Sequence, residues 1–258
     1  MMLHHLSDHV WYLEPDHRSD RPVLGYIRGS RRAFAVDAGA SAEHVRLFYD
    51  SLKEHGLPLP DLTGISHYHW DHSYGAAFVH GLTLASDRCN EQLIRESAFT
   101  WTREAMEERV EQGIDIAFGY HSKLAEYPDL SQIKVVPADL VLSGDLTVDL
   151  GDVTVQVLYC GGPHSDDHLM FYIPEDRVLF VSDASGKELF TLDWEYDAEH
   201  PELLQDCIDK LPYNTVKLAP FVELLEGLDF TRCLLGHADT VLTRAELLAE
   251  LKRHLPEK

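Results

Sequence analysis

Ser66-His67-Tyr68-His69-Trp70-Asp71-His72 is the stretch that decides how this 258-residue chain is interpreted. It follows the short apolar run Leu62–Ser66, which predicts a strand. His67 and His69 are two residues apart, so at the end of a strand both imidazoles leave the same face. The adjacent pair Asp71 and His72 would diverge in extended backbone, so the chain must turn there before both side chains can serve one site.

The crowding of these side chains indicates metal binding. Four potential ligands within six residues, beside an apolar strand, would be costly to place together without a cation. The spacing offers one pair of imidazoles to one cation and an Asp–His pair to a second. Imidazole and carboxylate suit zinc, and manganese, iron and cobalt remain open.

Three more ligand-type residues follow predicted strands further along the chain. His164 comes after the strand Val153–Leu158, Asp183 after Val178–Val181, and His237 after Thr231–Leu235. Taken singly, each would more often be a capping or hydrogen-bonding residue. A carboxylate at a strand end can also bridge two cations, as two-metal hydrolases require.

The rest of the chain alternates between strand and helix patterns. Further strands are expected at His9–Leu13, Val23–Arg28, Arg32–Asp37, Leu140–Leu142, Leu146–Leu150 and Leu169–Ile173. Helices are expected at Ala42–His55, within about Asn90–Tyr127, and at Pro201–Leu211 and Arg244–His254. This order predicts an α/β protein with two packed sheets and helices outside.

In order along the chain, these pieces resemble the metallo-β-lactamase superfamily. The resemblance covers nearly the whole chain: Asp37-Ala38-Gly39, the His-x-His-x-Asp-His stretch, the solitary His164, the strand-end Asp183 and Gly236-His237. It implies a four-layer αβ/βα sandwich of two mixed sheets. It also implies one domain over residues 1–258, with a helical insertion at about 90–127 that covers the site.

The resemblance also implies the roles of the individual residues. His67, His69 and His164 would hold one metal ion, Asp71, His72 and His237 a second, and Asp183 would bridge them. Asp37 would support the site without binding metal. The two ions would be divalent, with zinc favoured, and a metal-bridged hydroxide would attack the substrate, with Asp71 orienting it and passing a proton to the leaving group.

Some positions depart from the family pattern or concern the substrate. Pro163-His164 and Ser182-Asp183 stand where such proteins commonly show Gly-His and Gly-Asp, and Asp183 replaces the cysteine of one major lactamase class. His168 is a candidate substrate contact or replacement ligand, although it could equally be a polar edge residue. Lys187 could pair with a substrate carboxylate, although an exposed lysine is the simpler interpretation.

Composition narrows the substrate. Lys and Arg total 22 against 44 Asp and Glu, a net charge of −22 that disfavours nucleic acids and anionic membranes. Four cysteines without short spacing, no export signal and no apolar run of about 20 residues predict a cytoplasmic protein. The expected substrate is a small thioester, lactone or β-lactam, the first two being favoured. Whether the chain forms a homodimer stays open.

Two other classes of function compete with a hydrolase. One is a non-catalytic metal-binding or sensing protein with the same fold, and the other is a diiron protein that reacts with oxygen. All seven ligand positions implied by the resemblance are filled, which favours an enzyme.

Overall fold

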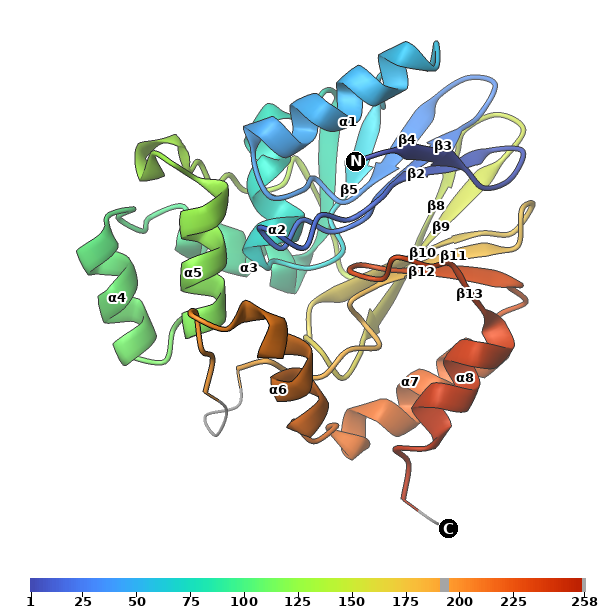
Figure 1. Ribbon diagram of the computed structural model, residues 1–258. Helices are drawn as coiled ribbons and strands as arrows, with labels where there is room; N and C mark the ends of the chain where they lie inside the picture. The colour runs from blue at the N-terminus through green and yellow to red at the C-terminus, as the bar shows by residue number, and fades with distance from the viewer. Residues whose placement is uncertain (191–194, 257–258) are drawn as a thin grey trace.

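Two β-sheets lie face to face with helices on their outer sides in the computed structural model, which describes residues 1–190 and 195–256 (Figure 1). The first sheet has the order β1-β2-β3-β4-β5-β6-β7. Its strands are Leu3–His5, Val10–Leu13, Leu24–Arg28, Ala33–Val36, Leu62–Gly64, Leu82–Ser86 and Leu140–Leu142. The second sheet has the order β13-β12-β11-β10-β9-β8. From β8 to β13, its strands are Leu146–Asp149, Thr154–Gly161, His168–Ile173, Val178–Ser182, Arg232–Leu235 and Leu242–Thr243.

Both sheets mix strand directions. Strands β1 to β4 pair antiparallel, whereas β4 to β7 pair in parallel. In the second sheet β11 and β12 are parallel and the other neighbours described are antiparallel. The αβ/βα sandwich of two mixed sheets predicted from the sequence is confirmed.

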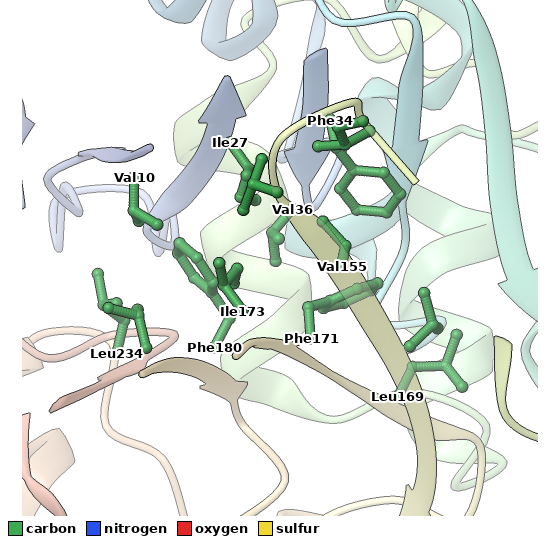
Figure 2. Close-up of a cluster of buried hydrophobic side chains, with 14 of the residues drawn as sticks. Val10, Ile27, Phe34, Val36, Val155, Leu169, Phe171, Ile173, Phe180 and Leu234 are labelled. Atoms are coloured by element: carbon green, nitrogen blue, oxygen red, sulfur yellow. The ribbon is translucent and has the colours of Figure 1, made fainter. Parts of the chain in front are cut away.

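The main core lies between the sheets, and β10 shows how it is built (Figure 2). Leu169, Phe171 and Ile173 pack in the cluster that includes Phe34 of the first sheet, whereas the alternate residues of β10 pack against outer helices. Because side chains alternate along a strand and both faces are covered, β10 reads in the sequence as a continuous apolar run.

The two sheets approach closely at glycines of the first sheet. A Cβ atom added to Gly64 would collide with the Phe171 ring, and one added to Gly25 would collide with the Phe180 ring. The aromatic rings of the second sheet therefore occupy space that a larger residue would need.

Outer helices cover both sheets. Helix α1, Ala42–Glu54, packs Phe48 and Leu52 on the first sheet, while α7, Thr215–Gly227, and α8, Arg244–Lys252, cover the second. The expected helix at Pro201–Leu211 is a 3-10 turn followed by α6, Leu204–Lys210. The sequence pattern did not indicate α7, which has Pro220 inside it, or the short strands β1, β6 and β13. No helix in the described part of the chain is both long and apolar enough to cross a bilayer.

The segment expected to be helical at about 90–127 forms three helices, drawn in green tones at one side of the first sheet (Figure 1). They are α3, Asp87–Glu96, α4, Arg103–Glu111, and α5, Ala117–Glu126. The buried Glu126 carboxylate accepts hydrogen bonds from Arg21 Nε at 2.8 Å, from Ser19 Oγ at 2.6 Å and from Ser41 Oγ. This ion pair fastens the loop before β3 to α5.

Candidate metal centre

The predicted cluster lies where β5 gives way to a short helix. Helix α2, Trp70–Ser73, begins just after His69, so Asp71 and His72 are on its first turn. The turn expected from the adjacent Asp–His pair is therefore present. The three distant residues follow β9, β11 and β12 of the second sheet, so the site forms where strand ends of both sheets meet.

His67, His69 and His164 form a first group of potential metal ligands, which we call the imidazole group. Each offers a ring nitrogen, and these nitrogens lie within 4.8 Å of one another. His69 Nδ1 is 3.1 Å from His164 Nε2. His164 Nδ1 donates to the carbonyl oxygen of Lys187 at 2.7 Å, which directs its Nε2 toward the site.

Asp71, His72, Asp183 and His237 form a second group, which we call the carboxylate group. Asp71 Oδ2 is 2.9 Å from His72 Nε2 and 3.1 Å from His237 Nε2. Asp183 Oδ2 is 3.4 Å from each of the same two nitrogens and 3.8 Å from His164 Nε2 of the imidazole group. The Asp183 carboxylate thus lies between the two groups.

The chain passes closely behind Asp183 at Gly236. A Cβ atom added to Gly236 would collide with Asp183 Oδ1. A glycine before His237 therefore lets β12 bring this histidine beside the carboxylate.

Asp37 belongs to neither group but holds residues around the site through hydrogen bonds. Its Oδ2 accepts from His72 Nδ1 at 2.8 Å and from Ser182 Oγ at 3.0 Å, and its Oδ1 accepts from Ser66 N at 2.7 Å. A carboxylate on one ring nitrogen fixes the tautomer, so His72 Nε2 is left to face the carboxylate group. Asp37 and Ser182 both have left-handed backbone, with φ of 65° and 50°.

The two groups hold their protons differently. Burial, followed by the neighbouring imidazoles, holds the pKa values of His67 and His69 well below the ordinary value. Burial would also lower the pKa values of His72 and His237, but the surrounding carboxylates outweigh it and raise both well above 6.5. In the absence of a cation, His67 and His69 are therefore neutral, whereas His72 and His237 form ion pairs with the surrounding carboxylates.

The donor set fits two divalent cations. His67 Nε2 and His72 Nε2 are buried and have no hydrogen-bond partner, an arrangement that costs free energy unless another group satisfies them. One group supplies three nitrogens, and the other supplies two nitrogens and two carboxylates. Such sets suit zinc and other first-row divalent ions.

Asp20 is a residue near the site that sequence reasoning missed. Its Oδ1 is 3.4 Å from His237 Nδ1, and its backbone is left-handed with φ of 59°. Burial raises its pKa to about 7, against the opposing effect of His237. Because Asp20 lies in a polar loop rather than after a strand, nothing in the sequence pattern distinguishes it.

Two cavities open beside the metal-binding groups. The first, about 470 Å³, is lined by both aspartates of the carboxylate group and by residues of α5 and α6. The second, about 540 Å³, shares His69 and His164 with the first and is lined mostly by charged and polar residues.

The two candidate substrate residues lie in different environments. His168 is buried and stacked on His67, with ring centroids 4.4 Å apart, and it lines neither cavity. Lys187 does line the first cavity, but its Nζ donates to the carbonyl oxygens of Ile208 and Asp209 at 3.1 and 2.8 Å.

The αβ/βα sandwich and the two groups of potential metal ligands together define the class of protein as a metallo-hydrolase. The family model described as "Metallo-beta-lactamase superfamily" matches residues 23–220. The chain belongs to this superfamily, as the order of motifs in the sequence predicted.

Solved structures with the same fold differ greatly from this chain in sequence. The inverting sec-alkylsulfatase Pisa1 from Pseudomonas sp. is 16% identical with a TM-score of 0.66, and the match covers 97% of this chain but only 41% of the sulfatase. A metallo-beta-lactamase family protein from Thermus thermophilus is 19% identical, with a TM-score of 0.65 and coverage of 97% and 80%. A metallo-beta-lactamase from Cronobacter sakazakii is 14% identical, with a TM-score of 0.63 and coverage of 98% and 92%.

Proposed function

We propose that this protein uses two metal ions to hydrolyse an ester-like bond in a small molecule, with thioesters and lactones favoured over β-lactams. The observation that carries the proposal is the position of Asp183. Its Oδ2 lies within 3.8 Å of nitrogen atoms from both metal-binding groups. A carboxylate in that position suits two cations held close enough together to act on one substrate.

Each group of side chains has a role in this proposal. The imidazole group holds one cation, the carboxylate group holds the other, and Asp183 is shared between them. When bound, two such ions, zinc being favoured, supply an acidified water molecule and polarise the oxygen of the scissile bond. Asp37 and the Lys187 carbonyl hold His72 and His164 in the orientations needed for binding.

Asp71 is the candidate for moving a proton. Burial by itself would raise the pKa of this carboxyl, but His72 and His237 outweigh that effect and hold the pKa below its usual value. Asp71 is therefore ionised and able to accept a proton from water and deliver it to a leaving group.

The decisive experiment is a hydrolysis panel on metal-loaded protein that covers thioester, lactone, β-lactam and phosphodiester substrates. Turnover of a thioester or lactone that disappears in the His67→Ala/His69→Ala double variant would support the proposal. Full metal loading without turnover of any substrate would instead favour a metal-binding or sensing protein. Metal analysis of protein purified without added metal tests the diiron alternative, since zinc alone would leave that idea without its cofactor.

A further inference from the structure

We propose that the 470 Å³ cavity binds an apolar part of the substrate that carries no anionic group. This inference rests on the proposed hydrolase function and adds the chemical class of the group that lies beside the metal centre. It is based on the cavity wall and on how the charged side chains in that wall are already paired.

Aromatic and aliphatic side chains form most of the wall. They come from the segment after β5, from α5 and its N-terminal turn, from the segment before residue 191 and from α6: Tyr68, Trp70, Ile116, Phe118, Phe190 and Ile208. Such a surface gains free energy by covering apolar groups, at about 25 cal/mol for each Å² removed from water.

Besides Asp71 and Asp183 of the carboxylate group, three carboxyl groups line this cavity, each with a neighbouring partner. Glu96 accepts a hydrogen bond from Tyr74 Oη at 2.8 Å, and Asp115 accepts one from Lys123 Nζ at 2.7 Å. The third, Asp20, faces His237. None of the three carries positive charge, so none can bind a further negative group.

No unengaged cation balances them among the described residues that line the cavity. Lys187 donates to two carbonyl oxygens, and His17 is paired with Asp239 at 2.9 Å. The remaining histidines of the wall belong to the metal-binding groups. Residues 191–194, which lie outside the described part of the chain, contain neither lysine nor arginine. A substrate carboxylate directed away from the metal centre into this cavity would thus lose its hydration without gaining a partner.

A pair of thiols that differ only at the far end tests this inference without relying on turnover. 1-Hexanethiol and 6-mercaptohexanoate both bind a metal ion through sulfur, and the thiolate–cobalt absorption band of the cobalt-loaded protein reports binding. We expect hexanethiol to bind more tightly by about tenfold or more, the ratio that corresponds to about 1.4 kcal/mol. Affinities within about twofold of each other would overturn the inference.

A charge placed in the cavity should reverse the preference. Ile116→Lys adds a cation to the wall, so we expect 6-mercaptohexanoate to gain on hexanethiol. Ile94→Lys is the matched control, because Ile94 is 52% exposed on α3 and lines neither cavity. If Ile116→Lys and Ile94→Lys changed the ratio of the two thiol affinities equally, the inference would be overturned.

A milder variant covers the case in which Ile116→Lys does not fold. Glu96→Gln removes one carboxyl group and keeps an acceptor for Tyr74. We expect the ratio of the affinity for hexanethiol to that for 6-mercaptohexanoate to fall. An unchanged ratio in this folded variant contradicts the inference. Absence of a cobalt–thiolate band with either thiol would instead count against the metal centre, and so against the proposed function on which the inference rests.

Discussion

The two metal-binding groups lie side by side and share Asp183, yet they are built in opposite ways. The imidazole group consists of three histidines, whose neighbours on the far ring nitrogens include the Ser66 hydroxyl and the Lys187 carbonyl. The carboxylate group contains two aspartates, and its histidines have the carboxylates of Asp37 and Asp20 on their far side. The two groups therefore show two ways of burying metal ligands: with few charged side chains nearby, or with opposite charges paired.

This difference should appear in how each group takes up metal. In the imidazole group His67 and His69 are neutral before binding, and the buried His67 Nε2 lacks the partner that a cation would supply. The histidines of the carboxylate group already form ion pairs with its aspartates and must lose protons before a cation can enter. The expected outcomes below test this contrast, from the largest effect to the smallest.

Replacing the shared carboxylate should affect both groups at once. We expect Asp183→Asn to lower kcat/KM for the best substrate by about a thousandfold, near the upper end of the loss seen when one preorganised polar group is removed from an active site. Metal content should fall below two equivalents per chain. Asp229→Asn, at a side chain that is 81% exposed, is the matched control. Unchanged turnover with both metals retained would refute a shared role for Asp183.

The pH dependence of metal binding should separate the groups. The pKa values of His72 and His237 are raised well above 6.5, so both are protonated at neutral pH and must release protons when a cation binds. Affinity for one metal equivalent should therefore rise with pH, by up to about a hundredfold per unit while both protons are displaced. The pKa values of His67 and His69 are lowered, so the other equivalent should vary little above pH 6.5. Titrations with a chelating dye at several pH values measure both, and two parallel profiles would contradict the contrast.

The two supporting aspartates should differ in importance. Asp37 accepts three hydrogen bonds at the base of the site, so Asp37→Asn should weaken metal binding by about ten- to a hundredfold. Asp20 is 3.4 Å from its histidine and less buried, so Asp20→Asn should cost about tenfold at most. Competition with a chelator for the more weakly bound metal equivalent measures the loss of metal affinity in each variant. A larger loss for Asp20→Asn would reverse the ranking.

The smallest effect is expected from the hydroxyl next to His67. Ser66 Oγ is 3.0 Å from His67 Nδ1, while the backbone N–H of Ser66 holds Asp37 independently. Ser66→Ala should therefore cost about 1 kcal/mol, or about fivefold in affinity, at the imidazole group, and less at the carboxylate group, which the hydroxyl reaches only through Ser182 Oγ. Isothermal titration of zinc into metal-free protein measures this change, and an equal loss at both equivalents would contradict it.

The parts of the site that could be predicted are those in which the ligand residues lie close together in the sequence with a regular spacing. His67 and His69 show the spacing of two that a strand requires, and Asp71 and His72 required a turn that α2 provides. His164, Asp183 and His237 follow predicted strands, and the resemblance to the superfamily implied their roles as ligands. What the sequence could not supply was any sign that Asp20 lies beside His237, because a polar loop residue looks the same wherever the loop is attached.

Some misses have identifiable physical causes. Helix α7 contains Pro220, which is usually read as a break, yet this helix is stabilised by packing Leu218, Phe221 and Leu225 on the second sheet. His168 begins β10, as expected, and the sequence did not indicate that its side chain would be stacked on His67 inside the protein. Tertiary packing decided both, and a single sequence does not record which of two faces a neighbour will cover.

Local patterns along the chain indicated two packed sheets and a centre rich in histidine and aspartate, because strand periodicity and ligand spacing are local properties, and the order of these motifs carried the resemblance to the superfamily. Only the folded chain decided that one carboxylate stands between two groups of unlike charge, and that the adjoining cavity has an apolar wall whose described residues include no free cation. Both depend on contacts between residues far apart in the sequence, as between Asp20 and His237. Burial and charge pairing at such separations exist only once the two sheets have packed together.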